Sequence, residues 1–425
     1  MRIAVVGAGI AGTTTAHELA LDGHEVVVFE RRSTVAEVAS FATGPLVAPG
    51  WTADWLGDQR RLRLPWATQG AGMRLPRLPP ASEWPWLWQW SQAGRTERQT
   101  PAQQLVHRAV RYSQQRRQDI GAEYELDHDR SEGMLVLWRD DREADLAQAA
   151  LNSLREADVA FKVLSAEQAR ALEPALHPET TLHGAVELQG EAVANCREFA
   201  LLIRSESQRL GARFEFDTLV RSIAPQVDGR VELTLTPAGP EAESRNERFD
   251  AVVLCAGALC PPLLRPLGLR LPLRTVHGHT LSAAVREPLD APLSAVLDAR
   301  SGVSISRLGQ RVRVAGGHYF GEPPAVPSKQ ALTLLYKVLA DWFPGAMRLG
   351  GPKGSIQEWQ AVRAAMPDGL PLLGATRQAG VWLNLGHETA GWAMACGNAR
   401  VLADRLRGRE PDIDLGGFAP QRLGL

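Results

Sequence analysis

The pattern of apolar and polar positions in the first thirty residues indicates two strands joined by a helix. Residues 2–6 form a short β-branched apolar run, a helical stretch follows a group of glycines, and a second apolar run covers residues 26–29. Short apolar runs bounded by turn residues are typical of buried strands. The chain is therefore expected to begin with a βαβ unit.

Apolar residues recur with helical periodicity in some later segments and with strand periodicity in others. Helical periodicity appears at residues 101–126, 142–157, 195–210, 330–342 and 391–407. Strand patterns appear at residues 133–138, 213–216, 230–235, 249–257 and 381–385, and strong alternation appears at 279–285, 302–307 and 311–316. The alternating segments predict an antiparallel sheet, the turn at Asp228-Gly229 predicts a β-meander, and the apolar run from residue 249 predicts a strand inside a parallel sheet.

A glycine-rich turn connects the first strand to the helix. It consists of Gly7, Ala8, Gly9, Ile10, Ala11 and Gly12. In a G-x-G-x-x-G turn, the first glycine permits the tight bend, the second lets the backbone approach a pyrophosphate, and the third brings the helix close to the strand. The second strand ends at Glu30, whose carboxylate can bind an adenosine ribose and would repel a 2′-phosphate. This order predicts a dinucleotide site, and the alternative is a glycine-rich loop that binds no ligand.

Composition excludes several classes of protein. The 425 residues are 44% apolar and 22% charged, with a formal net charge of −1, as in a soluble globular protein of about two domains. There is no basic excess for nucleic acid binding. No apolar run approaches the roughly 18 residues of a membrane span, and the first apolar run is too short for an export signal. The cysteines have no metal or redox spacing, so we expect buried thiols and no metal site at Cys196, Cys255, Cys260 and Cys396.

Four tryptophans occur within the seven residues 84–90. The favoured interpretation is the start of a packed helix with Trp84 and Trp88 on one face. The alternative is a partly exposed aromatic patch that meets a membrane surface, a quinone or a partner subunit. The sequence leaves both open.

A loop and a helix near the C-terminus offer a second set of cofactor contacts. The predicted strand at 381–385 leads into Gly386, His387 and Thr389, and the predicted helix begins near Gly391. The N–H groups of a helix that begins beneath a flavin ring would stabilise the negative charge that develops on reduction. We expect Thr389 to cap this helix, whereas His387 is either catalytic or a structural loop histidine. Because only one nucleotide motif is present, electrons are expected to come from an organic substrate.

Arg363 lies just before a Pro-Asp-Gly turn at residues 367–369. A guanidinium at such a place can bind a substrate carboxylate through two parallel hydrogen bonds. Arginine is plentiful in this chain, so the residue pattern alone favours a surface or ion-pair role.

These motifs together resemble those of the FAD-dependent D-amino acid dehydrogenases of the small-subunit type, within the D-amino acid oxidase and glycine oxidase superfamily. The resemblance extends over nearly the whole chain. It is carried by residues 5–12, 48–50, 86–89, 172–176 and 366–369 and, most specifically, by residues 382–397.

The resemblance implies noncovalent FAD, a mixed sheet of about eight strands over the substrate pocket, and oxidative deamination of a D-amino acid by hydride transfer to flavin N5. It implies that Arg363 binds the substrate carboxylate and that His279 and His387 lie near the reacting atoms. Besides the glycine turn, the cofactor-binding positions that we expect are Glu30, Arg31, Ser40, Ala42, Thr43, Gly44, Val220, Ala256, Gly257, Gly386, His387, Thr389, Gly391 and Trp392.

Three segments depart from the family pattern, the third being the diluted acidic, glycine-containing pattern around Gly190-Glu191-Ala192. The chain has Val362-Arg363-Ala364 where the family usually has Gly-Leu-Arg-Pro, and His277-Gly278-His279 where the family often has Lys-Gly-Tyr. The second departure places a shorter, titratable group near the expected pocket. The preferred substrate side chain is therefore left open.

The predicted fold is α/β, with a Rossmann-like FAD-binding domain (a parallel sheet with a β-meander) and an α+β substrate domain with a mixed antiparallel sheet. The FAD-binding domain is expected at residues 1–60, 150–268 and 355–425, and the substrate-binding domain at residues 61–149 and 269–354. Expected partners are an amino acid and a quinone or other electron acceptor, with no nucleic acid. A peripheral membrane contact and a homo-oligomer are left open, in the cytoplasm or at the inner face of the cell membrane.

The sequence is also compatible with three alternative functions. The first is an oxygen-using oxidase or dehydrogenase of glycine, sarcosine or a cyclic imino acid such as D-proline or hydroxyproline. The second is a nicotinamide-dependent dehydrogenase, and the third is a noncatalytic flavin-binding subunit.

Overall fold

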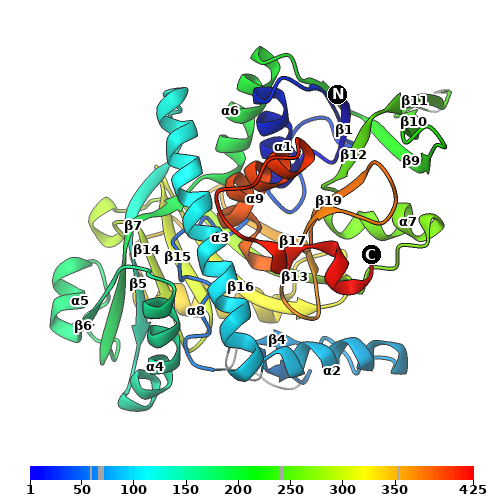
Figure 1. Cartoon of the computed structure of the whole chain (residues 1–425). Coiled ribbons are helices and arrows are strands. Elements are labelled where there is room, and N and C mark those ends of the chain that lie inside the picture. The colour runs from blue at the N-terminus through cyan, green and yellow to red at the C-terminus, as the bar shows by residue number, and fades with distance from the viewer. Residues whose placement is uncertain (58–59, 66–70, 95, 240–242, 353) are drawn as a thin grey trace.

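The computed structural model describes residues 1–57, 60–65, 71–94, 96–239, 243–352 and 354–425. Its described strands form a six-stranded sheet, a ten-stranded sheet and a three-stranded sheet (Figure 1). The predicted combination of a mostly parallel sheet with a mixed antiparallel sheet is confirmed.

The six-stranded sheet contains the βαβ unit at its centre. Its strands run in the order β18 (Leu372–Ala375), β19 (Val381–Leu385), β12 (Ala251–Leu254), β1 (Arg2–Val6), β2 (Glu25–Phe29) and β8 (Arg213–Glu215). Every neighbouring pair is parallel except β18 with β19. The apolar run from residue 249 therefore supplies an interior parallel strand, β12, as predicted.

The two faces of this sheet bury alternate residues of each strand, because successive side chains of a strand point to opposite sides. Ile3 and Val5 of β1 face the helices, whereas Ala4 and Val6 face the meander. The helical layer consists of α1 (Ile10–Leu21), α3 (Thr96–Glu123), α6 (Cys196–Arg209) and α9 (Gly391–Leu406). The opposite layer consists of α7 (Cys260–Leu264) and the predicted β-meander, β9 (Thr218–Pro225), β10 (Val231–Pro237) and β11 (Arg245–Phe249).

The ten-stranded sheet has a continuous path of eight strands, which agrees with the expected sheet of about eight. The path is β17 (Gln357–Ala365), β13 (Arg274–Ala284), β16 (Arg311–Phe320), β15 (Val303–Leu308), β14 (Ala295–Asp298), β5 (Arg130–Trp138), β7 (Gly184–Ala194) and β6 (Phe161–Ser165). The short strands β3 (Leu62–Arg63) and β4 (Met73–Arg74) join at β16. One face packs on α4 (Asp141–Glu156), and the other on α5 (Ala166–Leu172) and α8 (Lys329–Trp342).

The sheets divide the chain differently from the domain boundaries expected above. Strands β6 and β7 lie within residues 150–268, and β17 lies within residues 355–425, yet all three pair in the ten-stranded sheet. Helix α3 lies within residues 61–149 but packs in the core of the six-stranded sheet. The sequence gives each element its type, whereas membership of a sheet depends on pairing between segments that are far apart in the chain.

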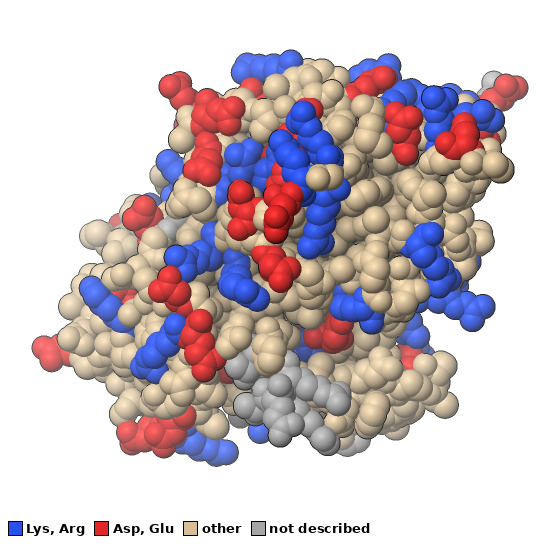
Figure 2. Space-filling model, in the orientation of Figure 1, with Lys and Arg blue, Asp and Glu red and all other residues tan. Residues whose placement is uncertain are grey.

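The tryptophan-rich segment forms the helix α2 (Trp84–Ala93), so the predicted helix is confirmed, whereas the side of Trp84 and Trp88 is exposed, as in the alternative interpretation. Trp86, Leu87 and Trp90 are the residues that it buries. Trp84 and Trp88 share the solvent-facing side and are 49% and 64% exposed. Figure 2 shows few charges where Figure 1 places α2, whereas charges of both signs are interspersed over the rest of this face.

A buried carboxylate joins three helices that are distant in the sequence. Glu18 of α1 accepts hydrogen bonds from Arg116 of α3 at 2.7 Å and from Arg400 of α9 at 2.8 Å. Its side chain is fully buried, so loss of either arginine would leave a poorly compensated charge in the interior. This ion pair network fixes α9, which begins at the candidate site, against the first helix of the chain.

All four cysteines are buried, as expected, and none of them belongs to a disulfide in the part of the chain that the structure describes. Burial raises the pKa of the Cys196 and Cys260 thiols to about 12. Within the described ranges, no helix is long and apolar enough to cross a bilayer, and no group of three or more His, Cys, Asp or Glu side chains is arranged to hold a metal ion.

Candidate active site

The glycine turn between β1 and α1 is held by contacts that exclude side chains. Gly7 has a φ of +101°, a left-handed conformation that favours glycine. A Cβ on Gly12 would lie 1.8 Å from the Gly7 carbonyl oxygen, and a Cβ on Gly7 would lie 3.0 Å from the Cα of Ala256. The turn therefore packs against the end of β12, where Ala256 and Gly257 were expected to line the same site.

Two helices begin at this site with N-cap residues that offer no capping side chain. The N-cap residues are Gly9 for α1 and Ala390 for α9, and neither provides a side-chain hydrogen bond. The prediction that Thr389 caps α9 is wrong, because the short turn of residues 388–390 precedes the helix and places Ala390 at the cap. Four helices elsewhere are capped by a side chain, those of Asp140, Ser165, Asn195 and Ser328. Uncapped N–H groups and the positive end of the helix dipole suit an electron-rich ligand.

Glu30 and Ser40 lie against the glycine turn. One carboxylate oxygen of Glu30 accepts the Ala8 N–H at 2.7 Å, and the other accepts the Arg32 N–H at 3.0 Å. The Ser40 hydroxyl accepts the Ile10 N–H at 3.0 Å. The end of β2 and the following loop are thus brought to the same turn, as the dinucleotide motif predicts.

The remaining residues expected to bind the cofactor differ in how deeply they are buried. In the loop after β2, Ala42 is buried, and the Thr43 carbonyl accepts a hydrogen bond from Arg313 at 3.1 Å. A Cβ on Gly44 would lie 3.4 Å from the Cβ of Ala315, so this loop passes over β16. Arg31 is exposed. Val220 is buried on β9, Gly257 has a φ of +53°, and the indole of Trp392 donates to the Ala194 carbonyl at 2.9 Å.

A chain of side-chain hydrogen bonds connects the first helix to the C-terminal loop. The Asn384 amide donates to the Thr15 hydroxyl at 3.0 Å, and its oxygen lies 2.8 Å from Nε2 of His387. The Thr14 hydroxyl also donates to the Ala395 carbonyl at 3.2 Å. Segments almost four hundred positions apart therefore meet at one place.

His387 faces the candidate cavity as a neutral imidazole. Because the Asn384 oxygen can only accept, Nε2 of His387 carries the proton and Nδ1 is left as an acceptor. Burial lowers the pKa of His387 to about 4. Its backbone pairs with Ala365 at the end of β17, so the loop of His387 and the strand of Arg363 are directly joined.

Arg363 lies on β17 over a glycine of the neighbouring strand. A Cβ on Gly278 would lie 2.1 Å from Nη2 of Arg363 and 3.4 Å from the ring of His318 on β16. Gly278 therefore makes the room in which the guanidinium lies beside the imidazole. Burial lowers the pKa of Arg363, and the negative charge of Glu388 partly offsets this effect. Burial also lowers the pKa of His318 to about 3.

His279 lies on the other face of β13. Residues 276 and 278 face Arg363, so residues 277 and 279 point to the opposite side. The ring nitrogens of His279 lie 3.2 Å from the Gly317 carbonyl and 3.1 Å from the Ser328 N–H at the start of α8. Burial lowers its pKa to about 4. Both nitrogens are thus engaged by the backbone, and the catalytic role expected for His279 stays a prediction.

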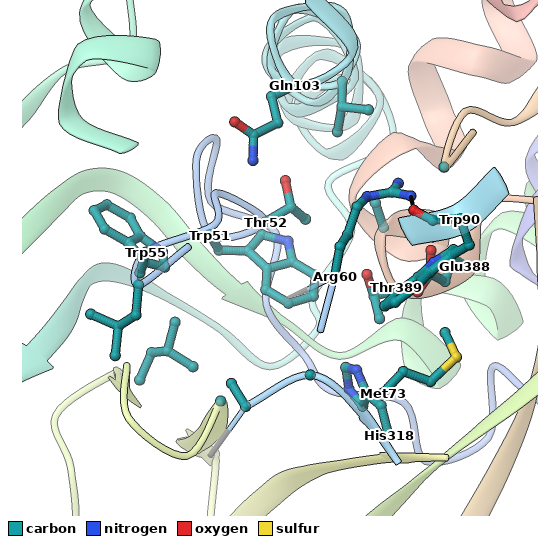
Figure 3. Close-up of a pocket in the computed structure, with 18 of the residues that line it drawn as sticks. Trp51, Thr52, Trp55, Arg60, Met73, Trp90, Gln103, His318, Glu388 and Thr389 are labelled. Atoms are coloured by element: carbon teal, nitrogen blue, oxygen red, sulfur yellow. Dashed lines mark hydrogen bonds between the residues drawn. The ribbon is translucent and has the colours of Figure 1, made fainter. Parts of the chain in front are cut away.

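A cavity lies between the N-terminal end of α9 and the ten-stranded sheet (Figure 3). In Figure 3, Gln103 reaches in from α3 on one side and His318 from β16 on the other. Trp51 and Trp55 lie toward one end, and Arg60, Trp90 and Glu388 lie toward the other. The lining thus has an aromatic end and a charged end, close to the uncapped helix.

Arg60 belongs to the charged end of the cavity. Its guanidinium contacts the carbonyl oxygens of Trp90, Pro367 and Asp368, each at 3.4 Å, and lies 5.5 Å from the centroid of the Trp90 ring. Burial lowers the pKa of Arg60, and the negative charge of Glu388 gives the largest opposing effect. Arg60 thereby ties α2 to the Pro-Asp-Gly turn after β17.

Comparison with known proteins identifies the family. A family model described as FAD dependent oxidoreductase, named DAO, matches residues 2–405. The chain belongs to the DAO family of FAD-dependent oxidoreductases. A D-amino acid dehydrogenase of Rhodopseudomonas palustris is 34% identical, over 97% of this chain and 96% of that protein. A D-amino acid dehydrogenase of Bradyrhizobium diazoefficiens is 32% identical over 99% of both chains.

Solved structures of DAO-like proteins share the fold. Glycine oxidase from Geobacillus kaustophilus superposes with a TM-score of 0.74 at 20% identity, covering 99% of this chain and 98% of that one. L-proline dehydrogenase from P. horikoshii gives a TM-score of 0.71 at 16% identity, covering 99% and 97%. At these identities the likeness concerns the fold alone.

The residues present fit FAD, the cofactor of this DAO protein. A long ligand with a pyrophosphate and an electron-poor ring needs two places where backbone N–H groups are available. The starts of α1 and α9 provide them, since neither N-cap residue offers a side chain and Ser40 accepts only the Ile10 N–H of α1. A side chain at Gly12 would clash with the Gly7 carbonyl and disturb the first of these places. Glu30 lies where the βαβ motif places the ribose-binding acid.

Sequence reasoning missed three residues of this DAO site. Arg60 was only one arginine of a Pro-, Arg- and Trp-rich tract. His318 lies within a bulge in the pairing of β13 with β16, which breaks the alternation of β16. Glu388 stood within the predicted loop, next to His387, without a role. For Glu388, the sequence did offer one signal, namely an acidic residue within a loop of small residues. For Arg60 and His318 it offered none.

Proposed function

We propose that this DAO protein oxidatively deaminates a D-amino acid to the 2-oxo acid and ammonia, and that Arg363 binds the substrate carboxylate. The observation that carries the proposal is the position of Arg363, whose Nε is buried without a hydrogen-bond partner and which makes no ion pair with any described residue. Its guanidinium lies beside His318, on the lining of the cavity where α9 begins. A buried cation without an acid partner favours an anionic ligand. The relatives named D-amino acid dehydrogenase support the choice of substrate.

Arg363 orients the substrate through two parallel hydrogen bonds to its carboxylate. Holding the reacting groups in one geometry accounts for a large part of catalysis in reactions of this kind. FAD, when bound, supplies the acceptor for the hydride that leaves the α-carbon. The resulting imino acid is hydrolysed by water, which gives the 2-oxo acid and ammonia.

The histidines on the cavity contribute as neutral groups. His387 donates Nε2–H to Asn384 and thereby holds the loop that precedes α9 against the first helix. His318 lies beside Arg363 and adds no second positive charge there, because burial keeps its pKa low. A guanidinium that forms no ion pair with a described acidic side chain, next to a neutral ring, favours one carboxylate in a defined place.

We further propose that electrons leave to a membrane quinone, with α2 resting on the membrane surface. Support comes from the exposed Trp84 and Trp88, since tryptophan is favoured at membrane interfaces. The wild type should sediment together with lipid vesicles, whereas a Trp84→Ser/Trp88→Ser variant should stay in the supernatant. Equal sedimentation of both would remove α2 from the proposal.

Anaerobic mixing of the purified yellow protein with matched D- and L-amino acids tests the reaction. Bleaching of the flavin absorbance by D-amino acids, at rates well above those of the L-enantiomers, is expected. No bleaching with any amino acid would exclude the proposed reaction. Rapid hydrogen peroxide formation in air would show that oxygen, and not a quinone, is the electron acceptor.

A further inference from the structure

We propose that the Glu388 carboxylate accepts a hydrogen bond from the substrate's amino group and so selects amines over other 2-substituted acids. This inference rests on the proposed function, which supplies the carboxylate anchor at Arg363. It adds the second ionic contact that an amino acid needs.

Glu388 is the one acidic side chain among the described residues that line the cavity. The other charged residues on the lining, Arg60 and Arg74, are cations. A substrate that enters with both a carboxylate and an ammonium therefore finds a single carboxylate for its positive end. Opposite charges placed to match a ligand give orientation and discrimination more than raw affinity.

Glu388 is close enough to Arg363 and Arg60 to act on both electrostatically, and it forms an ion pair with neither. Its negative charge acts on both guanidiniums, yet it forms no ion pair or hydrogen bond with any described residue. Arg60 does not depend on it, since three carbonyl oxygens already contact that guanidinium. Glu388 on the lining and Arg363, which lies beside the lining residue His318, are thus opposite charges that do not neutralise each other in an ion pair, and an α-amino acid carries the two groups that match them.

The backbone at Glu388 is held in a conformation that L-residues rarely adopt. Its φ is +50°, and it is the one residue of this kind on the described cavity lining, apart from the glycines. Such a conformation persists when neighbouring contacts fix it, and it is concentrated at functional sites. Here the fixed neighbours are His387, held by Asn384, and Gly386, whose Cβ position lies 2.9 Å from Met366.

The same carboxylate should oppose ligands that carry only a negative charge. A 2-oxo acid presents its carboxylate to Arg363 and has no proton to donate to Glu388. Removing the charge of Glu388 should therefore weaken the amino acid and strengthen the 2-oxo acid. These opposite signs distinguish a contact with the amino group from a general loss of structure.

The experiment compares the FAD-loaded wild type with Glu388→Gln, which keeps the size of the side chain, and Glu388→Gly, which relieves the left-handed backbone. Steady-state turnover of a D-amino acid with an artificial acceptor gives kcat/KM. Titration of the flavin absorbance with the corresponding 2-oxo acid gives its Kd. The matched control is Glu125→Gln, an exposed glutamate with the same φ of +50° outside the cavity.

Both Glu388 variants should lower kcat/KM for the amino acid by about tenfold or more, as loss of one charged hydrogen bond does. Their Kd for the 2-oxo acid should fall below that of the wild type, and Glu125→Gln should leave both values unchanged. Unchanged turnover in Glu388→Gln, or parallel weakening of both ligands, would overturn the inference. A wild type that no amino acid reduces would instead defeat the proposed function.

Discussion

Gly278→Ala should displace the substrate-binding guanidinium without unfolding the protein. The added methyl would lie 2.1 Å from Nη2 of Arg363, whereas ordinary contact begins near 3.4 Å. The guanidinium must therefore retreat by about 1.3 Å, the difference between these distances. It is the far end of a flexible side chain, so the side chain yields and the strand does not.

The displacement is large compared with the tolerance of a hydrogen bond. A shift of this size turns two parallel hydrogen bonds to a carboxylate into at most one. The loss of one charged hydrogen bond costs about 1.5–3 kcal/mol, which corresponds to a fall in kcat/KM of roughly tenfold to a hundredfold. Arg363→Ala, which removes the whole group, should cost at least as much.

The assay is steady-state turnover of a D-amino acid and of its amide, which lacks the carboxylate. Gly278→Ala should slow the amino acid and leave the slow reaction of the amide unaltered. Gly121→Ala is the matched control, because a Cβ on Gly121 meets nothing within 4 Å. The reasoning is refuted if the folded, flavin-loaded Gly278→Ala protein keeps the wild-type kcat/KM for the amino acid.

Three further predictions concern the cofactor and the buried histidines. Gly12→Ala should abolish FAD binding, because its Cβ would lie 1.8 Å from the Gly7 carbonyl oxygen; retention of stoichiometric flavin after purification would contradict this. Asn384→Leu should break the link from Thr15 to His387 and raise the Kd for FAD, and equal Kd values by fluorescence titration would show that the link is dispensable. Burial lowers the pKa of His107, His279 and His387 from 6.5 to about 4. Between these two pH values the unfolded chain therefore binds more protons than the folded protein. The free energy of unfolding should fall as the pH drops from about 6.5 to 4, by up to about 1.4 kcal/mol per pH unit for each histidine. A free energy of unfolding that is constant over this range, measured by urea titration, would show that these imidazoles are not buried as neutral groups.

The sequence predicted best what depends on neighbouring residues. The βαβ unit, β12 and the start of α9 at Gly391 each follow from a local run of apolar or small residues, and all are confirmed. The cap of α9 was wrong because three residues, 388–390, form a separate turn first. Sequence spacing indicates that a cap is available, but not which residue occupies the cap.

Contacts between distant strands could not be read from the sequence. Gly278 matters because the guanidinium of Arg363, on the next strand, occupies the place of a side chain there. His318 reaches the cavity because of a bulge between β13 and β16. His279 looked equivalent to a pocket residue, yet strand alternation turns it toward α8. Sheet membership of β6, β7 and β17 has the same origin, since pairing partners are chosen by packing over long separations.

The central claim is that the glycine turn and the C-terminal loop bind one FAD beside Arg363. A crystal structure of the FAD-loaded protein with a 2-oxo acid tests it most directly. We expect the pyrophosphate at residues 7–12, the flavin ring at the start of α9, and the ligand carboxylate on the guanidinium of Arg363. A flavin ring in a different cavity from the one that contains His318 and Glu388, or a carboxylate bound far from Arg363, would contradict it.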